Sequence, residues 1–544
     1  MPTAMSQQEL WKAVQEYGGY RPASREIGVP EATIRRKLKD YKPDLPEHAF
    51  IPDAADLPAT HVEEGGGDTI DLWAEQQKKP GTRRYIITSA QNNCRVHEPF
   101  FENLKALAKE VDAHLYVSFT LYDRQGYRGL TRGDGPVKKN EVWWDKSVEE
   151  YAVNTRCRLH KRLAFCGELD ILATARNPLS SLESYCGRSS LIVPHNKFAF
   201  QCVESRPHQM PKEMMTTGSV TRSRFIQRKA GQLAHFHHVI GALLVEVTDD
   251  GFWYAHHLNA EDDGSFYWLD RRVEGGVVTR TDDAAVGLIL GDIHHEKGDD
   301  EQFRIAREII RTHRPRYTFV HDLIDFRSRN HHNRKDPLFK VKVRQVSMAD
   351  EIQDAAAFLC HLTTAANFHS GQVVVVKSNH DEALDRWIRE ADWREDPDNA
   401  VFYLTLALKM VEAIEAGQEC DPLAEAIEAH WPVGPARPGT IAGPTFLKLD
   451  QSFEVEGIEC GIHGHAGPSG VRGTPKHYSK LGFKTFTAHT HSPSIVDGCY
   501  TVGVTGNLDM EYNRGPSKWM HCHGLIYPNG KRAFLFVKGG KWRA

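Results

Sequence analysis

Val286-Gly-Leu-Ile-Leu-Gly-Asp-Ile-His294 is the stretch from which the fold can be worked out. Its apolar run stops at Gly291, and two residue types that bind metal ions follow, Asp292 and His294. Because alternate residues of a strand face the same side, these two side chains are expected to point the same way. The stretch therefore predicts a buried strand that delivers an aspartate and a histidine together at its end.

The same arrangement recurs at four later strand ends. The apolar runs are Tyr317–Val320, Val373–Val376, Phe453–Ile462 and Phe483–Thr487. The polar groups that follow them are His321-Asp322-Leu-Ile-Asp325, Asn379-His380-Asp381, His463-Gly-His465 and His489-Thr-His491. A long helix, expected to be capped by Ser347, lies between the second and third runs. Short buried strands that alternate with helices predict an α/β fold with a sheet covered on both faces and a site at the strand ends.

The five polar groups, in this order, resemble the motif blocks of the calcineurin-like metallophosphoesterase superfamily. The resemblance covers about residues 284–544. His321, Ser378 and Ala488 stand where that superfamily generally has glycine, while every expected ligand position is retained. The resemblance implies a β-sandwich flanked by helices and a phosphoester hydrolase.

The resemblance also implies a centre of two divalent metal ions, bridged by Asp322. Such ions lie about 3.5–4 Å apart and share a carboxylate. The first ion would be held by Asp292, His294 and His491, and the second by Asn379, His463 and His489. His465 is the alternative to His463, which we favour because it stands at the strand end. Imidazole, carboxylate and amide oxygen without thiolate suit Mn²⁺, with Mg²⁺, Fe²⁺ and Zn²⁺ as alternatives.

The expected reaction places a hydroxide between the two cations, from which it attacks phosphorus in line. His380 is not needed as a ligand. We expect it to contact the phosphate and to protonate the leaving oxygen, with Asp292 or Asp381 as the residue that orients it. His380, Asp292 and Asp381 are therefore the candidate catalytic residues.

Residues 1–41 are predicted to form a small helix-turn-helix unit. Gly28-Val-Pro30 is a turn, and the helix Glu31–Lys39 after it exposes basic side chains. These are Arg35, Arg36, Lys37 and Lys39, which would contact DNA phosphates. The alternative is a basic amphipathic helix in a small interaction domain.

Two segments separate this unit from the first strand end. Residues 42–83 are rich in proline and glycine and are predicted to be a flexible linker without a core. Residues 84–283 are predicted to form a middle α/β domain, whose role the sequence does not reveal. Its basic cluster Arg222, Arg224, Arg228 and Lys229 could hold a phosphate backbone, but a solvated face is the preferred interpretation.

A basic loop directly follows the second strand end. Its candidate substrate-binding residues are Arg327, Arg329, His332, Arg334 and Lys335. Such a cluster suits a phosphodiester backbone, and a solvated charged loop is the equally weighted alternative. His521 and His523 look like a further metal pair but are interpreted as structural, because they lie beyond the five groups.

Composition limits the partners and the cellular compartment that can be expected for this protein. A net charge of −4 gives no global attraction to nucleic acid, so DNA must be bound by local patches. The 10 cysteines contain no Cys-x-x-Cys pair, which fits a reducing compartment. Neither a signal peptide nor a membrane span is expected. These features predict a cytoplasmic protein, in the host cytoplasm if the chain is phage-encoded, with no membrane partner; a homo-oligomer is left open.

The motifs together favour a Mn²⁺-dependent DNA nuclease. Ser89-Ala-Gln-Asn-Asn93 and Phe225-Ile-Gln-Arg-Lys-Ala-Gly231 resemble stretches of tailed-phage metallophosphoesterases, some of whose relatives are implicated in DNA degradation. Two alternatives remain open. One is a phosphodiesterase or phosphatase that acts on nucleotides or phosphoproteins, and the other is a non-enzymatic DNA-binding regulator.

Overall fold

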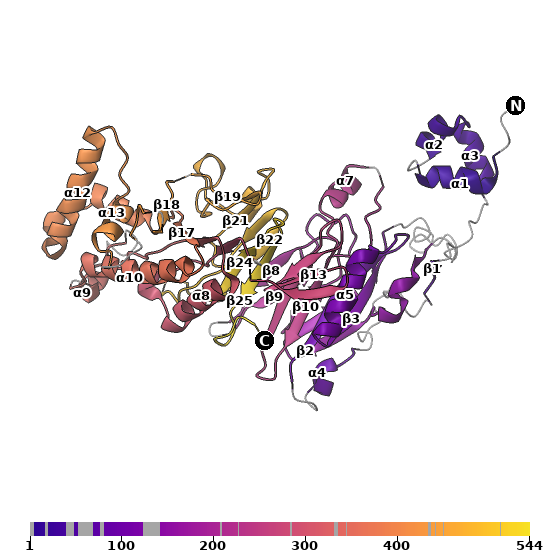
Figure 1. The fold of residues 1–544 in the computed structure, drawn as a ribbon, viewed down its shortest axis with the longest axis horizontal. Coiled ribbons are helices and arrows are strands. Elements are labelled where there is room, and N and C mark those ends of the chain that lie inside the picture. Colours follow the sequence, from indigo (N-terminus) through magenta and orange to yellow (C-terminus); the bar gives the residue numbers. More distant parts are fainter. Residues whose placement is uncertain are drawn as a thin grey trace.

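The computed structural model describes residues 5–16, 20–39, 48–52, 69–76, 81–122, 142–206, 209–226, 228–282, 285–330, 336–343, 345–432, 437–440, 442–449, 451–511 and 513–543. Over these residues the fold is mixed α/β, with sheets of two, three, four, six and ten strands (Figure 1). The predicted α/β class is therefore confirmed.

Three short helices with their own small core open the chain (Figure 1). They are α1 (Gln7–Glu16), α2 (Tyr20–Ile27) and α3 (Glu31–Lys37). Ser6 starts α1 as an N-cap, since its Oγ accepts the backbone N–H of Glu9 at 3.2 Å.

Two of the four basic residues expected to contact DNA already have partners. Arg35 pairs with Glu31 at 2.8 Å, and Lys37 donates to the carbonyl of Met5 at 3.2 Å. Arg36 and Lys39 are exposed. Contact with DNA through these residues stays a prediction.

Two described stretches of the predicted linker are packed, in contrast to the expectation of a segment without a core. Ala49 is buried in β1 (Ala49–Phe50), which pairs with β4 (Trp144–Asp145). In α4 (Leu72–Gln76), the Trp73 ring lies 4.5 Å from the ring of His160, centre to centre. These few apolar residues make packing contacts that the proline- and glycine-rich composition of the segment does not predict.

A four-stranded sheet of order β11-β10-β2-β3 opens the middle region. Its strands are β2 (Arg83–Gln91), β3 (Ala113–Thr120), β10 (Gly241–Val247) and β11 (Trp253–Asn259). β2 and β3 are parallel and joined by α5 (Glu98–Glu110), whereas β10 and β11 are antiparallel. A three-stranded meander follows, with β12 (Phe266–Trp268), β13 (Arg271–Glu274) and β14 (Val277–Arg280).

The six-stranded sheet contains the strands after which the first polar groups stand. Its order is β18-β17-β16-β15-β24-β25, with β15 to β18 parallel. The strands are β15 (Gly287–Ile289), β16 (Tyr317–Val320), β17 (Gln372–Val375), β18 (Thr445–Phe446), β24 (Cys522–Ile526) and β25 (Arg532–Phe536). The crossover helices are α8 (Asp300–His313) and α10 (Met348–Asn367). Ser347 caps α10 as predicted, because its Oγ accepts the backbone N–H of Asp350.

The ten-stranded sheet joins strands from either side of residue 283. Its order is β19-β20-β21-β23-β22-β8-β9-β7-β6-β5. The later strands are β19 (Glu454–Val455), β20 (Ile458–Glu459), β21 (Lys484–Thr487), β22 (Ser494–Val496) and β23 (Cys499–Thr501). The earlier strands are β5 (Arg156–His160), β6 (Leu163–Cys166), β7 (Ser190–Val193), β8 (Phe200–Val203) and β9 (Lys212–Thr216). Backbone pairing of Ile495 with Phe200 joins the two sets, so the boundary expected at residue 283 does not interrupt the sheet.

The two large sheets pack face to face. In β17, Val374 belongs to the core between the sheets, whereas Val373 and Val375 belong to the core under the helices. Ile289 of β15 and Phe319 of β16 share the inter-sheet core with Phe486 of β21. The six-stranded sheet is thus covered by helices on one face and by the second sheet on the other, because alternate strand residues serve opposite faces.

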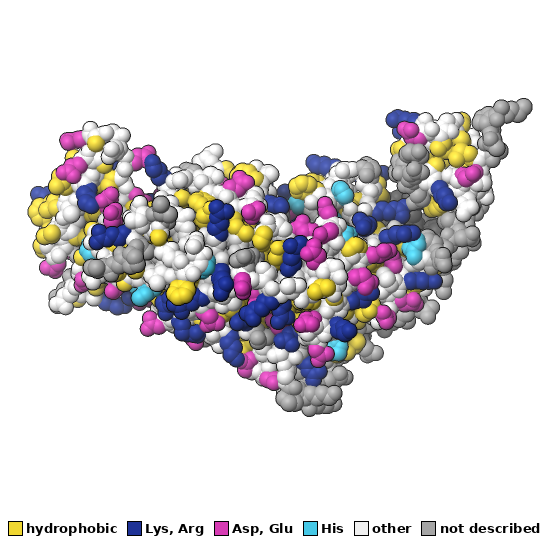
Figure 2. Space-filling model, viewed as in Figure 1, with side chains coloured by type: hydrophobic (Ala, Val, Ile, Leu, Met, Phe, Trp, Pro, Cys, Tyr) yellow, Lys and Arg dark blue, Asp and Glu magenta, His cyan; other side chains and the backbone are white. Residues whose placement is uncertain are grey.

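A helical excursion follows β17 and includes a helix with an exposed apolar face. It contains α11 (Glu382–Glu390), α12 (Ala400–Glu415) and α13 (Pro422–Ala429), and α9 (Pro337–Val343) lies before α10. One face of α12 is exposed, with Val401 at 80% and Ile414 at 66%, and its yellow side chains stand at the far left of Figure 2. No helix among the described residues combines the length and apolar character that a membrane crossing requires.

The predicted strand Phe453–Ile462 is wrong. The structure has a tight hairpin there, β19 to β20, with Glu456 and Gly457 both at positive φ.

Two further short helices are α7 (Lys229–Phe236) and α14 (Pro475–Tyr478).

Candidate metal centre

The ends of strands from both large sheets converge on one buried cluster. Asp292 and His294 follow β15, and Asp322 follows β16. Backbone hydrogen bonds continue past the strand ends, since the N–H of His294 donates to the carbonyl of Asp322 at 2.8 Å. From the other sheet, the N–H of His489 donates to Asp292 Oδ2 at 3.0 Å. These bonds hold the loops in fixed positions.

Four residues of these loops adopt a left-handed backbone conformation that is uncommon outside glycine. The φ values are 46° for His294, 45° for Asp322, 71° for His489 and 55° for His491. Such conformations cost about 1–3 kcal/mol each and persist where the surroundings impose them. Their concentration in one cluster is typical of a functional site.

One half of the cluster gathers around Asp292. His491 Nε2 lies 3.0 Å from Asp292 Oδ2 and 3.0 Å from His294 Nε2. His294 Nε2 lies 3.6 Å from Asp322 Oδ2. Asp292, His294, Asp322 and His491 are all buried, and each offers one ligand atom within 4.8 Å of the others. These four residues can hold a metal ion together.

The other half gathers on the far side of Asp322. His463 Nε2 lies 3.4 Å from Asp322 Oδ2 and 3.0 Å from Asn379 Oδ1. The His489 ring lies 5.3 Å from the His463 ring, centre to centre. His465 instead points toward Glu382, with His465 Nε2 3.8 Å from Glu382 Oε2. The geometry favours His463 over His465 as a neighbour of Asp322.

Burial fixes the protonation of these groups. It lowers the pKa of both His489 and His491 to about 4, which keeps the imidazole nitrogens free to bind a cation at neutral pH. Burial, followed by the charge of Asp322, raises the pKa of Asp292. A cation between the two carboxylates would reverse this rise.

The donor set fits divalent cations. Among the described residues, the buried atoms Asp292 Oδ1 and Asp322 Oδ2 have no hydrogen-bond donor. Buried carboxylate oxygens are costly unless they are hydrogen-bonded or bound to a metal ion. Neutral imidazoles, carboxylates and an amide oxygen converge here without a thiolate, which is the chemistry expected for an ion such as Mn²⁺.

Asp325 is the residue that sequence reasoning left without a role. Its Oδ1 lies 3.1 Å from His380 Nδ1 and 3.2 Å from His294 Nδ1, and its Oδ2 lies 2.8 Å from Lys297 Nζ. The backbone N–H of Asp325 donates to Glu296 at 2.6 Å. The three-residue spacing from Asp322 was the signal, but it did not reveal which histidine Asp325 would meet.

Asp381, expected as an orienter of His380, has a different part. Its Oδ1 accepts the backbone N–H of Ile324 at 3.2 Å, and its Oδ2 accepts the Oγ–H of Ser378 at 2.5 Å. Asp292 contacts His491 instead of His380. The residue that pairs with His380 is Asp325, because it alone of these carboxylates reaches Nδ1.

His380 is the strongest candidate for an acid in the cluster. Burial alone would lower its pKa, but the charges of Asp322 and Asp325 outweigh burial and raise it to about 9. At neutral pH the ring is therefore an imidazolium. Its Nδ1 is engaged by Asp325, which leaves Nε2 for a substrate.

The basic loop is only partly described. Arg327 pairs with Glu511 at 2.6 Å, and Arg329 pairs with both oxygens of Asp396 at 2.5 and 3.0 Å. Substrate binding by Arg327 and Arg329 stays a prediction, and His332, Arg334 and Lys335 lie outside the described residues.

His521 and His523 have structural partners. His523 Nδ1 accepts the backbone N–H of Gly291 at 3.1 Å, and His521 Nε2 lies 3.0 Å from the carbonyl of Gly506.

Comparison with known proteins finds a relative over most of the chain. No protein-family model matches the chain, and no solved structure matches it at a significant level. Protein A1 of Escherichia phage T5 is 36% identical over 490 residues, which cover 88% of this chain and 85% of that protein. Identity over this length shows that the chain belongs to the same family as Protein A1 of Escherichia phage T5.

Proposed function

We propose that this protein is a metal-dependent phosphodiester hydrolase of the calcineurin-like type and that its substrate is DNA. The observation that carries the proposal is the buried convergence of Asp292, His294, Asp322 and His491. The second sheet packed behind the strand ends agrees with the sandwich that the sequence resemblance implies.

The cluster would hold two divalent ions, with Asp322 between them. Asp292, His294 and His491 would complete one ion's ligands, and Asn379, His463 and His489 the other's. When bound, such ions activate a water molecule as the nucleophile and neutralise charge on the phosphate. Mn²⁺ is the proposed ion, because the ligand set is mixed nitrogen and oxygen.

His380 would supply the proton for the leaving oxygen. Asp325 fixes its ring through Nδ1, and the negative charge of Asp325 helps to raise the pKa of His380 and so to keep the proton in place. The ring is half-buried, so a phosphate group that enters the site can meet Nε2. Asp325 would hold the ring in this orientation throughout the reaction.

DNA is proposed as the substrate because of the N-terminal helices. The exposed Arg36 and Lys39 of this unit carry positive charge that suits a phosphate backbone. On the face of the molecule that Figure 2 shows, Lys and Arg side chains are interspersed with Asp and Glu side chains. A tethered basic unit would therefore deliver DNA to the hydrolytic centre.

The test is cleavage of linear, circular and single-stranded DNA with Mn²⁺. Wild type should cut DNA, and Asp322→Asn should abolish cutting. Asp392→Asn, which changes a partly exposed aspartate paired with Arg394, should cut like wild type. A form lacking residues 1–41, which removes the helical unit but keeps the packed residues of β1 and α4, should hydrolyse bis(4-nitrophenyl) phosphate normally but cut DNA less well.

Three results would change the proposal. Equal DNA cutting by the truncated form would remove the role of the N-terminal helices. Turnover of nucleotide or phosphoprotein esters without DNA cutting would favour a small-substrate phosphodiesterase or phosphatase. DNA binding with no turnover under any divalent ion would favour a non-enzymatic regulator.

A further inference from the structure

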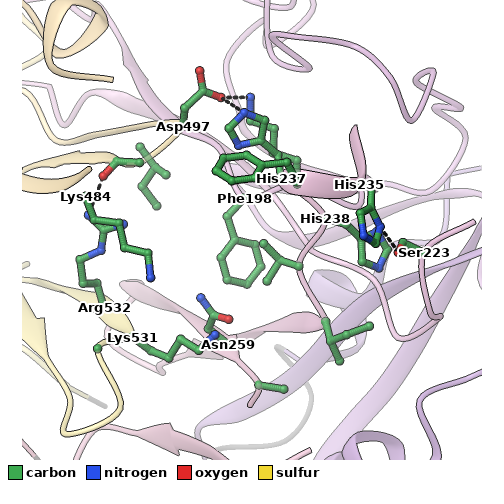
Figure 3. A pocket seen from close by; sticks show the side chains of 18 of the residues that line it. Phe198, Ser223, His235, His237, His238, Asn259, Lys484, Asp497, Lys531 and Arg532 are labelled. Carbon is green, nitrogen blue, oxygen red and sulfur yellow. Dashed lines mark hydrogen bonds and ion pairs between the residues drawn. The ribbon is translucent and has the colours of Figure 1, made fainter. Parts of the chain in front are cut away.

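A second candidate site lies in a pocket of about 740 Å³ that includes no residue of the metal centre. The pocket opens at the start of β21, where Lys484 stands, whereas His489 of the metal centre follows the other end of that strand. Five residues of extended chain span roughly 16 Å. Residues from α7 and from the β22–β23 turn complete its walls (Figure 3).

One wall of this pocket is cationic. Lys484, Lys531 and Arg532 line it together, and Figure 3 shows all three on the same side. Within the described part of the chain, no carboxylate forms an ion pair with any of the three. A wall of this kind attracts an anion.

Arg532 is the most informative of the three cations, because only 7% of it is exposed. Its Nη1 donates to the carbonyls of Thr485 and Gly498, both at 2.8 Å, and its guanidinium lies 4.0 Å from the centre of the Tyr500 ring. These contacts hold the side chain in place but bring no negative charge. Buried charges are usually paired, so an arginine of this kind next to a cavity points to an anionic ligand.

The three cations also act on one another. Partial desolvation, followed by the charges of Arg532 and Lys531, lowers the pKa of Lys484. Like charges held this close repel, and a bound anion would relieve the repulsion. The wall is therefore better suited to a charged ligand than to water alone.

The other walls are aromatic and polar and include the carboxylates of Glu261, Asp262 and Asp497, the last of which pairs with Lys197. Phe198 lies in the middle of the view in Figure 3, between the cations and the side chains of His235 and His238. Phe236 and Phe483 also line the pocket and are 79% and 51% exposed, which is unusual for such large apolar side chains. Exposed aromatic rings next to cations are the combination on which nucleic-acid bases stack while their phosphates are neutralised.

We propose that this pocket binds a nucleotide, either free or at the end of a DNA strand. Its phosphate would rest on Lys484, Lys531 and Arg532, and its base on Phe236 and Phe483. The size of the pocket falls within the roughly 300–1,000 Å³ of small-molecule sites. The inference depends on this pocket alone and not on the chemistry at the metal centre.

Calorimetric titration of the full chain in excess chelator tests the proposal. Deoxyadenosine monophosphate should bind more tightly than either deoxyadenosine or inorganic phosphate. Lys484→Glu and Phe236→Ala should each weaken its binding about tenfold, the loss expected for one charged contact or one stacked base. The matched controls are Lys109→Glu and Phe368→Ala, which change exposed residues outside the pocket and should bind like wild type.

Competition identifies the source of the nucleotide. Displacement by a short single-stranded oligonucleotide would assign the pocket to a strand end, and no displacement would assign it to the free nucleotide. The proposal would be overturned if neither the nucleotide nor the oligonucleotide bound. It would also be overturned if all variants bound equally well, or if phosphate bound as tightly as the nucleotide. Because no divalent ion is present, a failure of DNA cleavage leaves this result unaffected.

Discussion

Asp325 Oδ1 lies 3.1 Å from His380 Nδ1. The same oxygen lies 3.2 Å from His294 Nδ1, so one carboxylate contacts both the proposed acid and a proposed metal ligand. An ion pair with Lys297 and a hydrogen bond from the backbone N–H of Asp325 to Glu296 hold Asp325 in place. Asp325 thereby connects the position of the acid to the position of the metal.

Asp325→Asn should shift the pH dependence of the reaction. The Asp325 charge helps to raise the pKa of His380, so the wild-type kcat/KM should fall as pH rises through the pKa of this imidazolium. The amide removes this charge, the pKa of His380 falls, and the alkaline limb should move to lower pH. A pH–rate profile measures the shift, and an unmoved limb would exclude His380 as the acid that Asp325 supports.

His380→Ala should reduce kcat about 10²–10⁴-fold on DNA, the usual contribution of a general acid. The loss should be much smaller with bis(4-nitrophenyl) phosphate, whose leaving group departs without a proton. Mn²⁺ binding should be retained. His361→Ala, an exposed histidine on α10, is the control. An equal loss on both substrates would argue for a positioning role instead.

Arg329→Ala should destabilise the protein by about 1–3 kcal/mol, because its largely buried guanidinium binds Asp396 through two hydrogen bonds. Arg327→Ala should cost less than about 1 kcal/mol, since its pair with Glu511 is more exposed. Chemical denaturation compares the two variants. If Arg329 served only the substrate, its removal would raise KM and leave the unfolding free energy unchanged.

Glu213→Ala tests whether residues 84–283 and residues 284–544 share one core. Glu213 of β9 and Lys538 after β25 form a 2.8 Å ion pair with both side chains 1% exposed. Loss of one partner of a buried pair costs about 3–5 kcal/mol. Residues 84–283 and 284–544 should be destabilised together in hydrogen exchange, and Glu204→Ala, in an exposed pair with Lys518, should leave both unchanged. Destabilisation confined to residues 84–283 would show that the segments unfold independently.

Arg36→Ala and Lys39→Ala should weaken DNA binding in metal-free buffer. Each substitution should reduce the dependence of log K on log salt by about 0.9 for every DNA phosphate that the wild-type side chain neutralises. Arg25→Ala, an exposed arginine on α2, serves as the control. An unchanged salt slope in both variants would leave the helical unit without a DNA-binding role.

The sequence was most informative where a residue pattern has a single geometric meaning. Buried runs such as Val373–Val376 alternate between two cores, which predicts a covered sheet. Parallel strands place their carboxyl ends at one edge, so Asp292 and Asp322 could be expected to meet. The ligand types then indicated a metal site.

The sequence was least informative where contacts between distant segments of the chain decide the structure. The pairing of β8 with β22 joins residues almost 300 positions apart, and no local sequence pattern predicts this pairing. The partner of His380 depended on the path of the loop after Asp322, which brings Asp325 to Nδ1. Asp381 instead accepts hydrogen bonds from the backbone of Ile324 and the hydroxyl of Ser378. The hairpin at Gly457 interrupts an apolar run that local spacing predicted as one strand.

The number of Mn²⁺ ions bound per chain tests the central claim most directly. Equilibrium dialysis should give two ions for wild type, as expected for a carboxylate-bridged centre, and at most one for Asp322→Asn. Asp392→Asn should again bind two. Failure of wild type to bind Mn²⁺ or another divalent ion, or undiminished binding by Asp322→Asn, would contradict a metal centre built around Asp322.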